Sequence, residues 1–250
     1  MTIDAPNSDL IDYLLDRGRD HMAAPRVVVR FTADDAANEF INDLEGVPQA
    51  FVLACLLDRQ MPAEKVWAMP YAFRQALGAF DMQTLSAVPP SEWETLLRRS
   101  GHRFPERMSS VLSRGIERMV ALPGSDASAL WSDQPSSARL VRRFLAFHGA
   151  GPKIATMAVN ILVRDFKVPI ADHRCIDVSA DVQVNRVMAR LGLVSSPPDV
   201  TDVIYAAREL SPEFPGLLDL TLWSIGRDLC RPQKPRCDQC PLHAWCHFVT

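Results

Sequence analysis

The sequence predicts an all-α protein. Apolar residues recur at helical spacing through most of the chain, and no pair of alternating segments indicates β-strands. Prolines separate the helical segments along the whole length, and proline commonly marks a helix boundary. The chain has 250 residues, of which 48% are hydrophobic, so it can form one large domain or two small ones around a sizeable core.

Six segments carry the clearest helical patterns, whereas residues 1–30 are weakly specified. Residues 46–58 are almost wholly apolar, which is typical of a buried helix. In 137–147 and 153–163 the apolar side chains fall on one stripe of a helix. The other three helical segments are 182–191, 199–210 and 216–229.

The net charge of −3 is unevenly distributed. Residues 1–50 hold ten acids and four arginines, so the remaining 200 residues carry +3. Local basic patches attract phosphate more than the total charge does, but they are also typical of solvated helix faces. Three windows are locally basic: 98–118, 139–153 and 227–236.

The sequence indicates a cytoplasmic protein. No apolar run approaches the roughly 20 residues needed to span a membrane, and the polar, acidic segment 1–20 is unlike a signal peptide. The chain has six cysteines. In a reducing compartment, clustered cysteines favour metal binding over disulfides.

Four cysteines lie close together near the C-terminus. Cys230, Cys237, Cys240 and Cys246 are separated by six, two and five residues. Four thiolates in one short loop can enclose a soft metal centre, and a Cys-x-x-Cys step suits one metal or one edge of a cluster. Zinc is the alternative occupant, although zinc ribbons usually pair two Cys-x-x-Cys steps.

A helical hairpin is predicted where segment 137–147 meets segment 153–163. Gly149 and Gly151 permit a tight turn with positive φ. The following helix then presents backbone N–H groups suited to phosphate. Lys153 falls in its first turn, where the helix dipole disfavours an ammonium. A surface lysine that contacts phosphate is the alternative interpretation.

These motifs resemble endonuclease III and the adenine-specific mismatch glycosylases. The six-two-five cysteine spacing with KPRC inside it is similar to the iron–sulfur loop of that family, and FHGAGPKIA is similar to its helix-hairpin-helix motif. The resemblance implies a 4Fe-4S cluster on the four cysteines and a catalytic role for Lys153. It also implies DNA-backbone contacts by Gly149, by Gly151 and by the basic residues Arg231, Lys234 and Arg236.

Asp181 matches the family's essential aspartate. The segment DVQVNRV, residues 181–187, resembles the family pattern Asp-x-His-x-x-Arg-Val, with Gln183 in place of the histidine. An aspartate here also suits a helix N-cap, and an ionised carboxylate near C1′ would stabilise positive charge or help to deprotonate the nucleophile. Segment 171–180 is extra relative to the family, and Asp172 inside it is the rival acid. The insertion leaves substrate identity open.

Two segments resemble the family loops that open the duplex. Gln60 follows the predicted buried helix and matches the residue that fills the space of a flipped base. His102, with Phe104 as an alternative, falls in the second intercalating loop, and Arg103 suits a phosphate contact. A polar helix end before Pro62 is the alternative interpretation of Gln60.

The resemblance covers residues 47–248 and implies a two-lobed all-α fold. A six-helix barrel with the hairpin would occupy 48–165, and the iron–sulfur cluster lobe would occupy 1–47 plus 166–250. The implied function is a base-excision repair DNA glycosylase acting on double-stranded DNA with a damaged or mismatched base, and having AP-lyase activity through a Lys153 Schiff base. The alternatives are a monofunctional glycosylase in which Asp181 activates water, and a non-catalytic iron–sulfur DNA-binding protein. We expect a monomer associated with a bacterial nucleoid.

Overall fold

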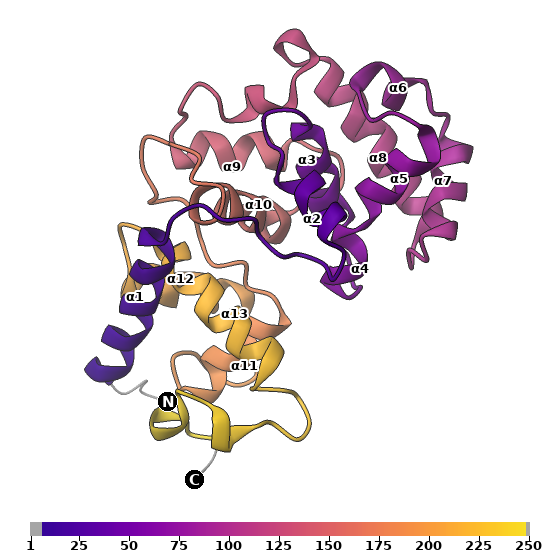
Figure 1. The fold of residues 1–250 in the computed structure, drawn as a ribbon. Coiled ribbons are helices and arrows are strands. Elements are labelled where there is room, and N and C mark those ends of the chain that lie inside the picture. The colour runs from indigo at the N-terminus through magenta and orange to yellow at the C-terminus, as the bar shows by residue number, and fades with distance from the viewer. Residues whose placement is uncertain (1–6, 249–250) are drawn as a thin grey trace. The chain divides into compact units, whose positions relative to one another are not determined.

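The structure is a computed structural model that describes residues 7–248. The ends of the predicted 1–47 and 166–250 segments therefore lie outside the described residues. All regular elements between 7 and 248 are helices (Figure 1). No helix in this part of the chain is long and apolar enough to cross a membrane.

The chain divides into two compact units, each built from segments that are distant in sequence. We call Arg26–Pro135 with Arg142–Ala158 the hairpin unit, and Met1–Pro25, Ser136–Val141 and Val159–Thr250 the cysteine unit. Residues 26–47 thus group with the hairpin unit, whereas our domain expectation placed them with the cysteine-rich segment.

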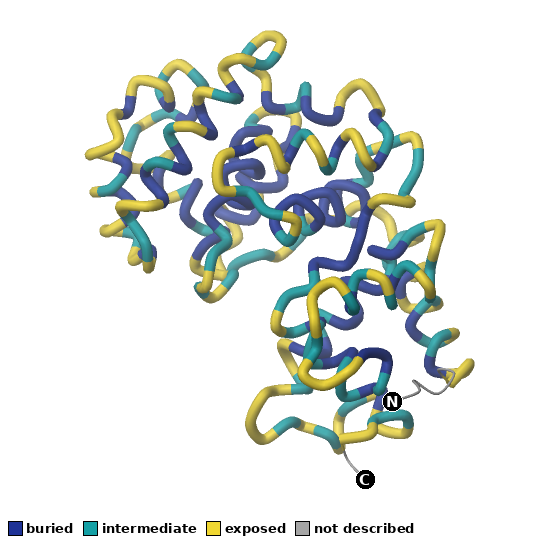
Figure 2. The backbone as a smooth tube through the Cα atoms, turned by 180° about the vertical axis from the view of Figure 1, so that it is seen from behind, coloured by how far each residue is buried: buried dark blue, intermediate teal, exposed yellow. Residues whose placement is uncertain are grey.

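The hairpin unit is organised around one buried helix, α3 (Pro48–Leu57). All ten of its residues are buried (Figure 2), as its apolar sequence predicted. Helix α3 contacts α2, α4, α5 and α8, and Pro48 starts it, because proline suits the first turn of a helix. The other helices that begin in this unit are α2 (Asp35–Asn42), α4 (Ala63–Trp67), α5 (Met69–Leu77), α6 (Met82–Ala87), α7 (Pro90–Arg99), α8 (Pro105–Val120) and the short η1 (Pro123–Ser125) and η2 (Ala127–Leu130).

Two helices flank the predicted hairpin. Helix α9 (Ser137–Leu145) and helix α10 (Pro152–Arg164) match the predicted segments 137–147 and 153–163 within two residues. Residues 146–151 between them contain no helix, so the predicted helix–turn–helix arrangement is present.

The cysteine unit contains one helix that our sequence patterns did not specify. Helix α1 (Ser8–Ala23) is started by the Asn7 side chain, which accepts hydrogen bonds from the first N–H groups. It contacts α13 (Figure 1), and its Leu10 and Leu14 join the core of this unit. The other helices are α11 (Val182–Arg190), α12 (Val200–Leu210), α13 (Asp219–Asp228) and the short η3 (Pro215–Leu218), η4 (Cys237–Gln239) and η5 (His243–Trp245).

Candidate functional site

The hairpin turn depends on one glycine rather than two. Gly149 has φ 82°, but Gly151 is not among the positive-φ residues, so the expectation that both bend the chain this way is wrong for Gly151. The Ala150 N–H donates to the Phe147 carbonyl and closes the turn. Gly151 instead precedes α10, where its carbonyl accepts from the Ala155 N–H. The first N–H groups of α10 follow directly, and such groups have no partner inside their helix.

Lys153 lies in the first turn of α10 and pairs with a carboxylate that the sequence did not point out. Its Nζ is 3.4 Å from Asp58 Oδ2. The Lys153 side chain is 42% exposed and that of Asp58 is 12% exposed. The carboxylate is therefore the fixed member of the pair, and the amine remains accessible from solvent.

Asp58 begins a short turn that also holds Gln60. The Arg59 guanidinium donates to the Gly149 carbonyl, which ties this turn to the hairpin. Burial lowers the pKa of Arg59, and the nearby charge of Arg107 acts in the same direction. Gln60 is exposed and has φ 49°, a backbone conformation that is uncommon for residues other than glycine and that often occurs at functional sites.

His102 supports the neighbouring loop from inside. It is 4% exposed. Its Nε2 lies 3.1 Å from the Leu57 carbonyl, and its Nδ1 accepts from the Phe104 N–H. Burial lowers the pKa of His102. Arg103 is the exposed side chain of this loop, with its guanidinium 5.2 Å from the centre of the Phe104 ring, so the structure leaves Arg103 rather than His102 available to a ligand.

Asp181 caps helix α11, as predicted. Its Oδ1 accepts from the N–H groups of Gln183 and Val184 at 2.8 and 3.0 Å. The preceding Ala180 has φ 39°, a strained conformation for alanine. Next to it, the Ser179 N–H donates to Asp219 Oδ1 at 2.6 Å. This bond holds the backbone that presents Asp181.

Asp219 is a buried carboxylate that sequence reasoning missed. It is 7% exposed, and burial raises its pKa, whereas the nearby Arg164 guanidinium acts against that shift. The Arg164 Nη1 lies 3.8 Å from Asp219 Oδ2. Asp219 starts α13, a place where acidic residues are common for capping reasons alone. The sequence therefore gave no signal that separates it from an ordinary first-turn acid.

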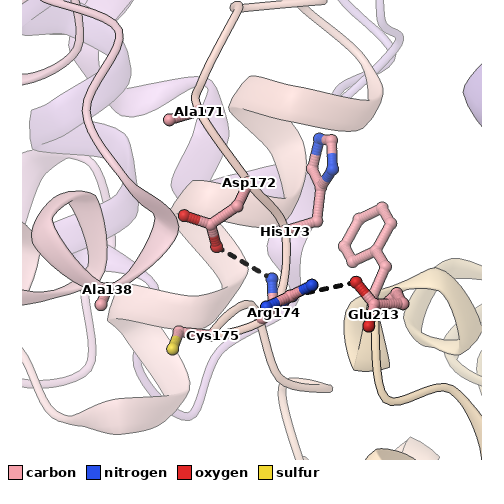
Figure 3. Close-up of a pocket in the computed structure, with 8 residues that line it drawn as sticks. Ala138, Ala171, Asp172, His173, Arg174, Cys175 and Glu213 are labelled. Atoms are coloured by element: carbon pink, nitrogen blue, oxygen red, sulfur yellow. Dashed lines mark hydrogen bonds and ion pairs between the residues drawn. The ribbon is translucent and has the colours of Figure 1, made fainter.

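The rival acid Asp172 is engaged within the inserted segment. It accepts from the Ser137 hydroxyl and from the Arg174 N–H, and the Ser137 hydrogen bond lowers the pKa of Asp172. Asp172 lines an open cavity of about 590 Å³ (Figure 3). The cavity also contains the stacked rings of His173 and Phe214 and the ion pair between Arg174 and Glu213.

The four C-terminal cysteines line one small cavity. Cys230 follows α13, Cys237 and Cys240 lie at the ends of η4, and Cys246 follows η5. All four are half-buried and none forms a disulfide. Burial raises the pKa of Cys240, and the charges of the other three thiols act in the same direction. All four cysteines therefore face the same small cavity.

The four thiols are soft donors of the kind that can hold a metal ion or an iron–sulfur cluster. Between residues 7 and 248, no three His, Cys, Asp or Glu side chains are arranged to hold a metal ion. Arg190 donates to Cys230 Sγ at 3.3 Å and to the Arg231 carbonyl, so the loop is already tied to α11.

Three basic side chains project from the loop between the first two cysteines. Arg231, Lys234 and Arg236 are all exposed, and none of the three forms an ion pair with a described residue. They therefore remain available to an anionic partner.

Comparisons with known proteins support the resemblance. No family model matches the chain. Endonuclease III of Sulfolobus acidocaldarius is 32% identical over 110 residues, which are 43% of this chain and 45% of that protein. Endonuclease III of Thermotoga maritima is 27% identical over 168 residues, which are 66% of this chain and 68% of that protein. The first match thus spans less than half of the relative's length.

Solved structures extend the likeness to the whole fold. A non-covalent endonuclease III–DNA complex matches with a TM-score of 0.65 and 19% identity, and the match covers 98% of this chain and 97% of that one. A thermostable thymine-DNA glycosylase matches with a TM-score of 0.63 and 14% identity over 96% of this chain and 95% of that one. The predicted all-α fold of the helix-hairpin-helix glycosylases is therefore confirmed.

Proposed function

We propose that this chain is a DNA glycosylase that removes a damaged or mismatched base from duplex DNA and cleaves the resulting abasic strand through Lys153. One observation carries this proposal: Lys153 lies in the first turn of the helix that follows the Gly149 turn, with its amine 42% exposed. The fold and the sequence similarity to endonuclease III support the same activity.

The proposed chemistry joins an amine and a carboxylate. The neutral Lys153 amine attacks C1′ of the flipped nucleoside, the base leaves, and a Schiff base forms. The lyase step then follows from that covalent intermediate. Asp181 stabilises the positive charge that develops on the sugar. As the cap of α11, its carboxylate accepts two N–H hydrogen bonds, which fix its position at the start of the helix.

The DNA contacts are proposed from exposed groups on both units. The backbone of Gly149 and Gly151 would meet a phosphate, as would the loop cations Arg231, Lys234 and Arg236. Gln60 would fill the space left by the flipped base. Arg103 would contact the backbone beside it, while His102 keeps that loop in place.

We further propose that Cys230, Cys237, Cys240 and Cys246 hold a 4Fe-4S cluster. These residues would hold the cluster, which would serve a structural role in the loop and take no part in base removal. The side chains of Arg231, Lys234 and Arg236 would then be held in a fixed arrangement for the DNA backbone.

Borohydride trapping on a panel of single-lesion duplexes tests the function. Wild-type protein should release one class of base, nick the strand and form a covalent adduct, and Lys153→Ala should form none. Base release without a nick or an adduct would instead indicate a monofunctional glycosylase in which Asp181 activates water. Tight DNA binding without base release on any duplex would indicate a non-catalytic DNA-binding protein.

A further inference from the structure

Asp58 is placed where a proton must be removed. Its Oδ2 lies 3.4 Å from the Lys153 Nζ, and its side chain is only 12% exposed. It directly follows α3, and its N–H donates to the Cys55 carbonyl at 3.2 Å. The carboxylate is thus anchored to the most buried helix of the hairpin unit, while the amine opposite it remains reachable.

An ammonium cannot act as a nucleophile, so Lys153 needs a proton acceptor. The other titratable groups that the structure places around the pair are unsuited to that task. Burial raises the pKa of Cys55 well above its ordinary value, and the charge of Asp58 adds to the effect, so this thiol stays protonated. Arg59 carries a guanidinium, which stays protonated in proteins. Among the residues that the structure describes, Asp58 is the carboxylate that pairs with this amine and can accept its proton.

We propose that Asp58 is a second catalytic carboxylate, which takes the ammonium proton of Lys153 and leaves Asp181 to stabilise charge on the sugar. This inference rests on the proposed glycosylase–lyase function. Asp58 would then deprotonate Lys153, and Asp181 would only stabilise the positive charge on the sugar. Asp181 Oδ1 is already engaged in capping α11.

The proton and electron balance closes with these two side chains. Asp58 takes one proton from the ammonium, and the nitrogen lone pair forms a bond to C1′. The base departs with the electrons of its glycosidic bond and receives the proton held by Asp58. A second nitrogen proton passes to the ring oxygen as the sugar opens, which leaves a protonated Schiff base on Lys153 and an ionised Asp58.

Nucleotide binding supplies the driving force for the first transfer. In the free protein the amine is partly exposed to water and lies 3.4 Å from the Asp58 carboxylate. A flipped nucleotide that covers the amine removes that water. Desolvation of two adjacent charges is costly, and it favours the neutral acid and amine over the ion pair.

The test is single-turnover borohydride trapping on preformed abasic duplex, with Asp58→Asn as the main variant. At neutral pH the trapping rate should fall about 100-fold, within the range typical of general-base removal. The deficit should shrink as the pH rises toward the lysine range, because solvent hydroxide then removes the proton. Asp58→Glu retains a carboxylate and should recover much of the rate. Glu64→Gln, at an exposed acid on α4, is the matched charge control and should trap like wild type.

Three outcomes would overturn the proposal. Trapping by Asp58→Asn at or above the wild-type rate would mean that Asp58 only restrains the amine. A deficit that stays constant across pH would mean that Asp58 positions Lys153 without taking its proton. If Asp58→Glu traps abasic DNA no faster than Asp58→Asn, the carboxylate is not the proton acceptor. If wild-type protein traps no abasic DNA, the lyase function fails first, and that result is distinct from all three.

Discussion

The two ring nitrogens of His102 have defined hydrogen-bonding roles. Because the Phe104 N–H donates to Nδ1, the other nitrogen carries the hydrogen and donates to the Leu57 carbonyl. A second proton on the ring would sit on Nδ1 and place an N–H donor against the Phe104 N–H donor. The neutral ring is therefore part of the folded loop that carries Arg103.

This arrangement predicts a pH dependence of stability. The pKa of His102 is lowered in the folded state, mainly by burial, so the unfolded chain binds the proton more tightly. The stabilising contribution is then complete above the unfolded value of about 6.5 and is lost as the pH falls below it. Urea unfolding at pH 7.5 and pH 5 should show this loss, and His102→Gln should reduce the difference in stability between the two pH values. His21 and His173 also have pKa values lowered mainly by burial, so His102→Gln should remove only part of it.

A second residue-scale prediction concerns Asp219. Its Oδ1 holds the Ser179 N–H next to the strained Ala180. Asp219→Ala leaves that buried donor without an acceptor and should lower the free energy of unfolding by about 1–3 kcal/mol. Asp219→Asn still offers an oxygen and should lose less. Equal losses in the two variants, measured by urea unfolding, would show that the negative charge matters more than the hydrogen bond.

At the scale of elements, Gly149 and Gly151 of the hairpin differ in how strongly the backbone requires glycine. A Cβ on Gly149 would combine φ 82° with a 3.0 Å approach to the Val111 side chain, whereas a Cβ on Gly151 would meet nothing within 4 Å. Gly149→Ala should therefore lower the free energy of unfolding by about 1–3 kcal/mol, and Gly151→Ala should leave it nearly unchanged. Thermal unfolding of the two variants side by side checks this. A comparable loss in Gly151→Ala would show that both positions constrain the turn.

The cysteine loop gives a second element-scale prediction. Protein purified without oxygen should be yellow-brown and contain iron and sulfide, and Cys240→Ala should lose both the colour and most of the iron. Cys175→Ala is the matched control, because Cys175 is exposed and lies in the inserted segment. Colourless wild-type protein that contains zinc would contradict the cluster and support the single-ion alternative.

The sequence predicted helices well where a segment was almost wholly apolar or carried its apolar side chains on one stripe. The buried helix at 46–58 and the pair flanking the hairpin were found within two residues of their observed bounds. Helix α1 was missed because charged residues interrupt its apolar pattern. Its few buried side chains, such as Leu10 and Leu14, are explained only by their packing in the core of the cysteine unit. For the candidate site, the pairing of Asp58 with Lys153 joins residues 95 positions apart, and no local pattern encodes such a contact.

At the scale of the whole molecule, the net charge of −3 does not show which cationic side chains are free to bind DNA phosphate. Many arginines are already neutralised by neighbouring acids: Arg19 lies 2.7 Å from Asp16, and Arg98 forms an ion pair with Glu94. The Debye length is about 8 Å at physiological salt. Distant acids therefore do little to cancel a local cationic patch, and an acidic protein can still bind DNA.

The salt dependence of DNA affinity tests this view of the charge distribution. Each phosphate contact by a free cation releases condensed counterions and adds about one unit to the slope of log affinity against log salt concentration. Replacing Arg231, Lys234 and Arg236 together by alanine should thus reduce the slope by about three units, since all three are exposed and form no ion pair with a described residue. Arg19→Ala with Arg98→Ala should leave the slope nearly unchanged, because those cations already pair with carboxylates and would neutralise few phosphates. Equal reductions in both variants would mean that total charge, rather than its local placement, governs DNA binding.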